Sequence, residues 1–314
     1  ASPFLVEVQE SAVKPIEPVF LDYQKDMSQL KAKSDIPILY KQNVANDLFQ
    51  LIYVFDMGNN HDKALGTAFD YLEYLGTSDM TPEELKSEFY RLACTFYVSP
   101  GNERTYVVLS GLNENMPAAV QLFEKLLADA QVNKEAYTNM TSDILKARSD
   151  AKLNQGQNFS RLMSFAMYGP KSPATNLLTE AELTNMNPQE LVDRIHNQNS
   201  YKHRILYYGP SSSKNLLATI NQVPAALKDI PAGNEYSYLE TPVTKVLIAP
   251  YDAKQIYMAQ ISNLDKKHDP AIEPIRALYD EYFGGGMNSI VFQEMRETRG
   301  LAYSAWASIM PPSY

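Results

Sequence analysis

The sequence predicts an α+β fold made of two copies of one sheet-plus-helices domain, with the second copy truncated. Segments rich in Ile, Leu, Val, Phe and Tyr, which favour strands, alternate with segments whose apolar residues have helical spacing. Short strings of residues recur in the same order 207 or 208 positions apart. The chain has 314 residues, which is enough for about two domains.

The first α+β domain is expected at residues 36–235, after an extended linker or docking arm at residues 1–35. The arm is polar and interrupted by prolines. The domain opens with two strand-like segments, IPILYKQ and DLFQLIYVFDMG. The segment DKALGTAFDYLEYLG follows and has the apolar spacing of a helix.

A second helix is predicted in the segment TPEELKSEFYRLA. Thr81 is its expected N-cap, Pro82 occupies the first helical position, and Glu84 stands three residues after the cap. Cys94, the single cysteine, lies in the apolar segment RLACTFYV and is expected to be a core residue rather than a nucleophile. The other predicted elements are strands at 94–98 and 103–110 joined by a turn at 100–102, helices within 115–168 and 187–197, the strand RILYYG and the helix SKNLLATINQ.

The repeat predicts an incomplete second α+β domain at residues 241–314. His61-Asp62 recurs as His268-Asp269, and the string YLEYLG recurs as YDEYFG. The segment TKVLIAPYDAKQIYMAQISN predicts two strands like those that open the first domain. Chance similarity of short strings is the alternative explanation. Because a half-built sheet exposes its strand edges, we expect the chain to be a fragment or to fold against something else.

Composition and charge argue against several classes of protein. The formal net charge is -9, whereas proteins that bind nucleic acids or other phosphates usually carry a basic face. Apolar residues make up 45% of the chain, which argues against disorder. No apolar run approaches the roughly 18 residues that span a membrane, and the first residues show no signal peptide.

Residues 284–304, GGGMNSIVFQEMRETRGLAYS, combine a glycine-rich turn, a short helix and the string Arg-Gly-Leu-Ala-Tyr-Ser. This segment resembles the C-terminal signature of the pitrilysin/insulinase-type zinc metallopeptidases, the inverted zinc-motif peptidases that include mitochondrial processing peptidase. Repeated α+β domains are typical of that family. The resemblance therefore implies a metallopeptidase-like fold for both predicted domains.

The resemblance also implies where a zinc site should lie, and the required residues are missing there. Active members carry His-x-x-Glu-His on an early helix, where two imidazoles bind zinc and the carboxylate activates a water molecule. A more distant glutamate completes the ligand set, and its position falls within 145–148, where no carboxylate stands. The positions that correspond to the motif are Thr67, Ala68, Phe69, Asp70 and Tyr71.

The four histidines offer no other metal site in the sequence. No two of them lie at i, i+4 spacing, and none has a carboxylate in a metal-like local pattern. The histidines are His61, His196, His203 and His268. We therefore expect no metal and no cofactor in this chain, and zinc on the partner half.

Arg296 and Tyr303 are the candidate substrate-binding residues. Gly300 permits a turn from the short helix that carries Arg296 into the strand LAYSAWAS. The resemblance implies that this arginine and tyrosine act in trans, on substrate held beside the zinc of the other half. The ordinary alternative is a surface ion pair of Arg296 with Glu294 or Glu297, with Tyr303 as a plain strand residue.

The short helix has its own expected details. Asn288 or Ser289 is expected to cap it. Arg296 is expected to lie off its apolar stripe, which consists of Val291, Phe292 and Met295.

The glycine triplet Gly284, Gly285 and Gly286 is the remaining candidate element. It is expected to form a flexible turn beside the substrate path. A phosphate-binding loop is the weaker interpretation, because the triplet follows a helix and lacks the Gly-Lys-Ser/Thr ending.

These features together predict a non-catalytic, substrate-binding half of a zinc-dependent endopeptidase assembly that hydrolyses peptides. The chain alone is expected to be inactive. Its expected partners are a peptide substrate and a zinc-bearing catalytic half, in the same polypeptide or in a separate subunit. The alternative is a structural or assembly subunit with the same fold and no peptidase activity. Because bacterial relatives are often exported, the resemblance implies a location in the periplasm or cell envelope.

Overall fold

The structure is a computed structural model that describes residues 2–12, 16–18, 20–33, 35–223, 228–263 and 269–310. The chain divides into two compact units. Unit 1 contains Ala1–Asn158 and Pro170–Tyr236, and unit 2 contains Phe159–Gly169 and Ser237–Tyr314.

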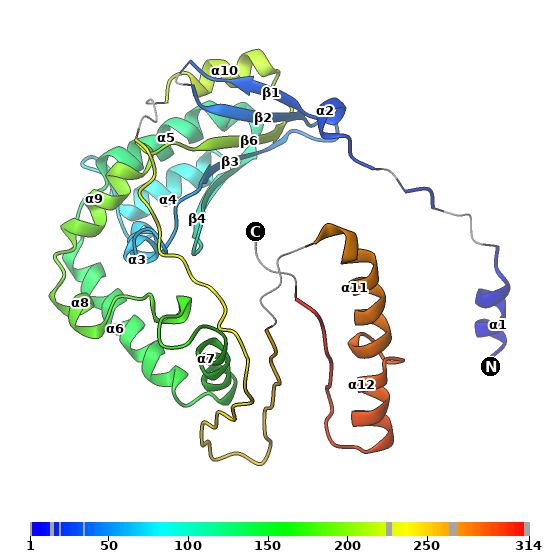
Figure 1. Ribbon diagram of the computed structural model, residues 1–314. Helices are drawn as coiled ribbons and strands as arrows, with labels where there is room; N and C mark the ends of the chain where they lie inside the picture. Colours follow the sequence, from blue (N-terminus) through cyan, green and yellow to red (C-terminus); the bar gives the residue numbers. More distant parts are fainter. Residues whose placement is uncertain are drawn as a thin grey trace. The chain divides into compact units, whose positions relative to one another are not determined.

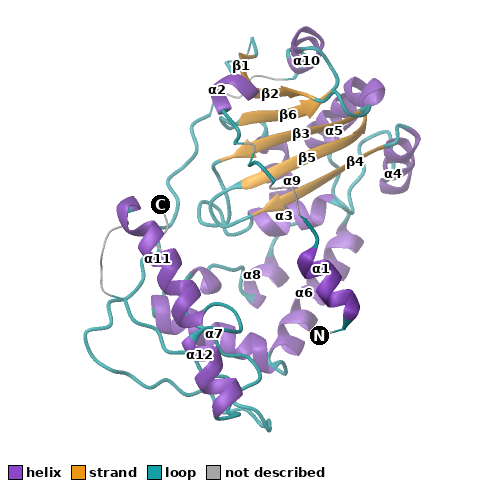
Figure 2. Cartoon of the chain, turned by 90° about the vertical axis from the view of Figure 1, so that its right-hand side faces the viewer, coloured by secondary structure: helices purple, strands orange, loops and turns teal. Residues whose placement is uncertain are grey.

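Unit 1 is built on a six-stranded sheet with the order β1-β2-β6-β3-β5-β4 (Figure 2). Strands β2 and β6 are parallel, and all other neighbours are antiparallel. The predicted strands of the first domain are confirmed, and so is the α+β fold class. The strands are β1 Ser28–Lys31, β2 Pro37–Gln42, β3 Leu48–Phe55, β4 Cys94–Pro100, β5 Thr105–Leu112 and β6 Arg204–Gly209.

The helices account for most of the remaining regular structure. The predicted cap of α4 is confirmed, because Thr81 and Glu84 form a reciprocal capping box. The helix α8 was not predicted. The α-helices are α1 Pro3–Glu10, α2 Tyr23–Asp26, α3 Leu65–Leu72, α4 Pro82–Arg91, α5 Met116–Asp129, α6 Lys134–Ala151, α7 Gln155–Tyr168, α8 Glu180–Asn185, α9 Gln189–Gln198, α10 Ser213–Ile220, α11 Glu273–Tyr279 and α12 Ile290–Phe292.

The N-terminal arm is not simply extended, as the sequence had suggested. Helices α1 and α2 lie within it, and residues 28–31 form the edge strand β1. Strand β1 forms because its backbone pairs with β2 and because Leu30 packs against the core. Ala32 and Ile36, which follow it, are buried. The last part of the arm therefore belongs to the sheet.

One face of the sheet forms the core of unit 1. Alternate residues of the central strand, such as Leu51 and Tyr53, are buried on this face. Helices α3, α5 and α9 pack together on the same side of the sheet (Figure 1). On the other face, side chains such as Gln50, Tyr106 and Tyr208 are exposed. Cys94 is buried in the core, as predicted.

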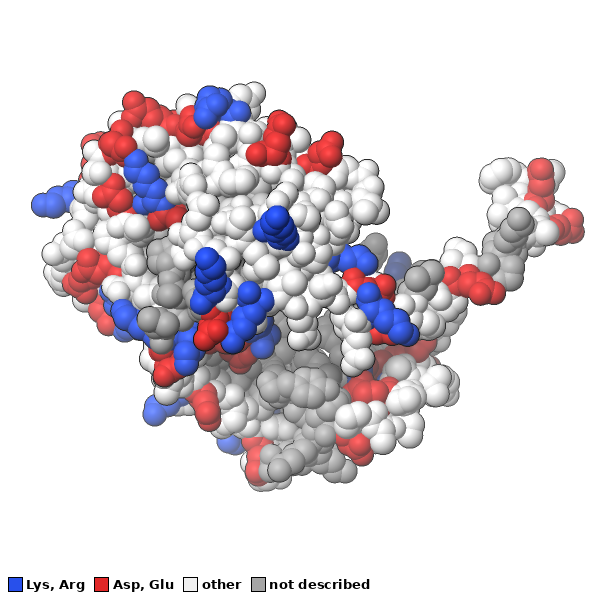
Figure 3. Space-filling view, turned by 90° about the horizontal axis from the view of Figure 1, so that it is seen from above, with Lys and Arg blue, Asp and Glu red and all other residues white. Residues whose placement is uncertain are grey.

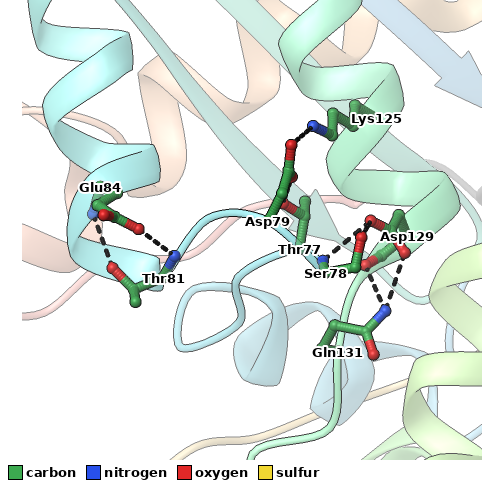
Figure 4. Close-up of polar contacts among 8 residues, drawn as sticks. All are labelled: Thr77, Ser78, Asp79, Thr81, Glu84, Lys125, Asp129 and Gln131. Carbon is green, nitrogen blue, oxygen red and sulfur yellow. Dashed lines mark hydrogen bonds and ion pairs between the residues drawn. The ribbon is translucent and has the colours of Figure 1, made fainter.

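The loop after α3 is fastened to the end of α5 by polar contacts (Figure 4). The backbone N–H and hydroxyl of Ser78 both donate to Asp129, and Lys125 pairs with Asp79. Gly76 is required in this loop, because a Cβ atom there would lie 2.2 Å from the carbonyl oxygen of Met80. The end of α3 is therefore held in one position.

Unit 2 contains most of α7, two further helical stretches and long segments that are neither helix nor strand. The stretch α11 continues into a π-helical turn, η4 Asp280–Gly284, and α12 continues into a second one, η5 Gln293–Thr298. Residues 237–263 form neither helix nor strand, and the Asn263 N–H donates to Thr241 Oγ1 at 2.8 Å.

The strands predicted at 244–263 and 301–308 are wrong for this structure. Neither segment forms a strand ladder within the residues that the structure describes. A strand requires a neighbouring strand for its backbone hydrogen bonds, and no sheet is present in the described part of unit 2. The second copy of the domain therefore stays a prediction, and His268 of the repeat lies outside the described residues.

Within the described ranges, no helix combines the length and apolar character needed to cross a lipid bilayer.

The carboxyl group of Glu124 on α5 is buried in unit 1. Its Oε2 accepts a hydrogen bond from Asn199 Nδ2 at 2.7 Å, and its Oε1 is shielded from water. Burial raises the pKa of Glu124 to about 7, although interactions with Asn199 and with the Tyr53 hydroxyl oppose the shift. The folded state therefore binds a proton that the unfolded state releases near pH 4.5.

We predict that the free energy of unfolding of the wild type falls as pH rises through 7, because the buried Glu124 ionises, and that the Glu124→Gln variant does not show this fall. Because the folded-state pKa is raised, this contribution is fully present below pH 4.5 and is lost through pH 7. Chemical unfolding at pH 5 and pH 8 should show that the stability of the variant relative to wild type rises by about 2.5 kcal/mol between the two pH values. The exposed Glu114→Gln control should show no such gain. Equal pH dependence in Glu124→Gln and wild type would contradict the assignment.

Candidate functional site

Helix α3 carries the five positions that correspond to an inverted zinc motif, and three of them belong to the core. Ala68, Phe69 and Tyr71 are buried, Thr67 is half-buried and Asp70 is exposed. The helix therefore presents no pair of imidazoles one turn apart to a metal ion.

Tyr71, at the last motif position, is fully occupied by structural contacts. Its hydroxyl donates to the carbonyl oxygen of Asn133 at 2.6 Å and accepts from the Asn133 N–H at 2.9 Å. Its ring packs edge-on against Tyr137 at 5.7 Å between centroids. Asn133 in turn caps α6 by accepting from the Ala136 N–H. Tyr71 thus joins α3 to the start of α6.

The residues on α6 do not complete a metal site either. At 145–148, where the resemblance predicts a glutamate, Arg148 donates from Nη1 to the carbonyl oxygen of Leu178 at 2.6 Å. In the described part of the chain, no group of three His, Cys, Asp or Glu side chains could hold a metal ion. The side chains at the motif positions therefore do not fit zinc.

The described histidines take part in local structure. His61 Nδ1 accepts from the Gly58 N–H at 3.1 Å. His196 Nε2 donates to the carbonyl oxygen of Ala130 at 3.1 Å. His203 is buried, and burial lowers its pKa although Nδ1 donates to the carbonyl oxygen of Tyr201.

In unit 2, the structure brings Arg296 and Tyr303 into direct contact. The guanidinium carbon of Arg296 lies 4.7 Å from the centroid of the Tyr303 ring and 4.8 Å from that of Phe292. Each cation–π contact at an exposed position contributes about 0.5–1 kcal/mol. The planar guanidinium is therefore held by two aromatic rings, one from the helix and one from the segment after it.

The turn at Gly300 makes this contact possible. Gly300 has a φ of +57°, in the left-handed region that favours glycine. The Gly300 N–H donates to the carbonyl oxygen of Arg296 at 3.1 Å, and the Leu301 N–H donates to that of Met295 at 2.8 Å. These bonds end the helix and turn the chain so that Tyr303 meets Arg296.

Phe292 was not recognised from the sequence as a partner of Arg296. The prediction that Arg296 lies off the stripe containing Phe292 is wrong, since the two side chains are in contact. Their i, i+4 spacing was the signal available, because residues four apart are neighbours on a helix. Ser289 is confirmed as the cap, with its Oγ accepting from the Phe292 N–H.

The glycine triplet has a defined geometry. A Cβ atom on Gly284 would lie 1.9 Å from the carbonyl oxygen of Ala307, so only glycine allows the segment after Tyr303 to run back against this helix end. Gly285 donates its N–H to the carbonyl oxygen of Asp280, and Gly286 has a φ of +76°. The segment is tied again where the Ile309 N–H donates to the Asp280 carboxylate.

The structure also contains one of the surface ion pairs that were the alternative interpretation of Arg296. Its Nε lies 3.4 Å from the Glu297 carboxylate, which is a long ion pair with both side chains substantially exposed. Exposed pairs of this kind contribute little, about 0–1 kcal/mol. Glu294 pairs instead with Arg299. Tyr303 is 86% exposed, and its hydroxyl makes no hydrogen bond within the described residues.

The face shown in Figure 3 has no large patch that is uniformly positive or uniformly negative. Lys and Arg side chains are interspersed with Asp and Glu on this face. Such mixed charge is typical of an ordinary solvated surface.

Comparisons with known proteins identify the fold. No protein-family model matches the sequence, and no curated protein matches it either. Among solved structures, the chain is similar to a peptidase M16 inactive domain from Pseudomonas fluorescens, with a TM-score of 0.65 and 17% sequence identity. This match covers 91% of the present chain and 71% of the other.

Two further structures are similar. The periplasmic protease PqqL from Escherichia coli matches with a TM-score of 0.59 and 13% identity over 76% of the present chain, which spans 30% of PqqL. A protease from Helicobacter pylori matches with a TM-score of 0.62 and 11% identity, covering 90% of this chain and 71% of that one. The chain therefore has the fold of a peptidase M16 inactive domain, the kind of fold that the resemblance to the pitrilysin/insulinase-type peptidases predicted.

Proposed function

We propose that this chain is the non-catalytic, substrate-binding half of a zinc-dependent endopeptidase assembly. Arg296 and Tyr303 would bind the backbone of a peptide substrate, and zinc would be held by a partner half. The observation that carries this proposal is the contact of the Arg296 guanidinium with the rings of both Phe292 and Tyr303.

These ring contacts suit Arg296 to bind a peptide carbonyl. Aromatic rings make no ordinary hydrogen bonds with the guanidinium, so its N–H donors can still be accepted by a carbonyl or carboxylate oxygen. The rings also restrict the side-chain rotamers before substrate arrives, so less conformational entropy is lost on binding. Among the described residues, the acceptor that competes for Arg296 is the Glu297 carboxylate, 3.4 Å from its Nε.

Tyr303 would act as a hydrogen-bond donor next to Arg296. Tyr303 is exposed and its hydroxyl makes no hydrogen bond in the described part of the chain, so it can approach a carbonyl oxygen on which negative charge develops. The glycine triplet would support this arrangement, because Gly284 lets the segment that follows Tyr303 lie against the helix.

The degenerate zinc motif supports the assignment of catalysis to another half. Tyr71 at one motif position is committed to Asn133, and a neutral phenol is a poor zinc ligand. The catalytic half would belong to the same polypeptide or to a separate subunit. A location in the periplasm or cell envelope is part of the proposal, and it agrees with the periplasmic location named for PqqL.

One binding experiment compares the contribution of Arg296 to peptide binding with that of the neighbouring Arg299. Arg296→Ala should weaken the binding of fluorescein-labelled, unfolded casein about tenfold or more, because a hydrogen bond to a charged donor contributes about 1.5–3 kcal/mol. Arg299→Ala is the matched control, since Arg299 lies three residues away and pairs with Glu294. Fluorescence anisotropy of the whole chain measures both.

Two outcomes of this measurement oppose the proposal. Equal losses in Arg296→Ala and Arg299→Ala would place the peptide elsewhere. No saturable binding of casein by the wild type would favour the alternative function, a structural subunit with the same fold.

A second binding experiment distinguishes what the Tyr303 hydroxyl contributes to peptide binding from what its ring contributes. Tyr303→Phe keeps the ring against Arg296 and removes the hydroxyl, so binding should weaken only about two- to tenfold. Tyr303→Leu also removes one ring contact and should weaken binding further. Nitrogen-15 relaxation at Arg296 Nε should report a more mobile side chain in Tyr303→Leu than in Tyr303→Phe. Identical mobility in both variants would show that the ring does not hold the arginine.

A further inference from the structure

The outer face of the unit 1 sheet, which is the face away from the core, carries a continuous row of apolar side chains. Helices α3, α4 and α5 contact the sheet from the core side, and Figure 2 looks onto the outer face. In the strand register, each member of the row stands directly opposite a member on the next strand. From β2 to β4 this apolar row consists of Leu39, Leu206, Ile52, Val108 and Tyr97.

Most of the apolar row offers surface to a partner. Tyr97 is 53% exposed, and Leu39, Ile52 and Leu206 are half-buried, whereas Val108 is buried. Neighbouring strands lie about 4.8 Å apart, so the row is about 19 Å long. Continuous apolar surface of this kind, unlike single exposed apolar residues, is typical of a contact site.

The charges on the outer face favour an acidic occupant. None of the residues that the six strands direct to this face is Asp or Glu, although the chain has a net charge of -9. The basic residues there are Lys31, Lys41 and Arg204. Lys31 pairs with Asp35 and Arg204 with Asp56. Lys41 is exposed and has no ion pair among the described residues, so it is the cation available to a carboxylate.

Helix α1 has the complementary composition. Its Phe4, Leu5 and Val8 lie within an arc of about 100° around the helix axis, and Glu7 and Glu10 fall outside that arc. No basic residue precedes position 14. The helix has 8 residues, none of them buried, and the hydrogen bonds around it join residues 2–11 to one another. Because isolated helices shorter than about 12 residues are marginal in water, α1 requires a surface to pack against.

The N-terminal arm is long enough to bring α1 onto its own sheet. The arm leads into β1, which pairs with β2, where the apolar row begins. Residues 11–22, between α1 and α2, can span up to about 40 Å, which exceeds the length of the row. A tethered segment has an effective concentration on the order of millimolar, which favours its own sheet over that of another molecule in dilute solution.

We propose that the N-terminal arm is a strap that closes over the outer face of its own sheet, with Phe4, Leu5 and Val8 packed on the apolar row. Glu7 or Glu10 would pair with Lys41. Closure gives α1 the packing that a short helix lacks and removes apolar surface of the row from water. A peptide that binds this face must then displace the strap. The proposal is independent of Arg296 and Tyr303, which belong to unit 2.

Hydrogen–deuterium exchange of the whole chain tests whether α1 is held. Amides of residues 2–12 should be protected at least about tenfold relative to an unstructured peptide, because an undocked short helix opens readily. Protection should be equal at about 1 µM and about 50 µM chain, since a strap acts within one molecule. Protection that rises with concentration would assign α1 to a second copy and overturn the strap, as would exchange at the unstructured rate at both concentrations.

Variants on the sheet test where α1 docks. Tyr97→Ser and Lys41→Glu change exposed side chains of the outer face, and each should lower the protection of residues 2–12 at least about threefold. Tyr90→Ser is the matched control, because Tyr90 is 87% exposed and lies on α4 on the other side of the sheet. Unchanged protection in both folded outer-face variants would show that α1 packs elsewhere.

Variants on the arm test which side of α1 makes the contact. Phe4→Ser should lower the protection at least about threefold. Val6→Ser, on the opposite side of α1, controls for the change in helix propensity and should have a smaller effect. Equal losses of protection in the two variants would contradict docking through Phe4.

Discussion

The two hydrogen bonds between the Tyr71 hydroxyl and the backbone of Asn133 are the constraint on which much of unit 1 depends. They join α3, which packs on the sheet, to the capped start of α6. Because Tyr71 is fully buried, its hydroxyl would cost free energy without these partners. The position that the resemblance assigns to a metal ligand is thus used to hold the fold together. Packing at this position and metal binding exclude each other.

The two units present different kinds of chemistry. Unit 1 buries its apolar residues on one sheet face and fixes its loops with polar contacts, as at Ser78 and Asp129. In unit 2, many large apolar side chains are exposed, and order is local, as in the contacts of Arg296 with Phe292 and Tyr303. Such local order is sufficient for binding, because only a few side chains must be held in place. The proposed division between a structural unit and a substrate-binding unit follows from this difference.

Local signals explain what could be predicted from the sequence. The capping box of Thr81 and Glu84 and the strands of the first domain were found because caps and apolar patterns act over a few residues. Strand β1 was missed because its formation depends on pairing with β2, which a local pattern does not contain. The segments at 244–263 and 301–308 have strand-like composition but form no ladder in the described structure, for the same reason. For the site, the resemblance singled out Arg296 and Tyr303 as candidate residues, whereas the contacts of Arg296 with Tyr303 and with Phe292 are visible only in the structure.

The central claim is that this chain binds substrate and leaves the metal chemistry to a partner. The most direct measurement is the zinc content of the purified chain by elemental mass spectrometry, after dialysis against a zinc-containing buffer and then against buffer without zinc. The account predicts a stoichiometry near zero, because Thr67 and Tyr71 replace imidazoles and Arg148 occupies the region of the third ligand. One tightly held zinc ion per chain would contradict the account.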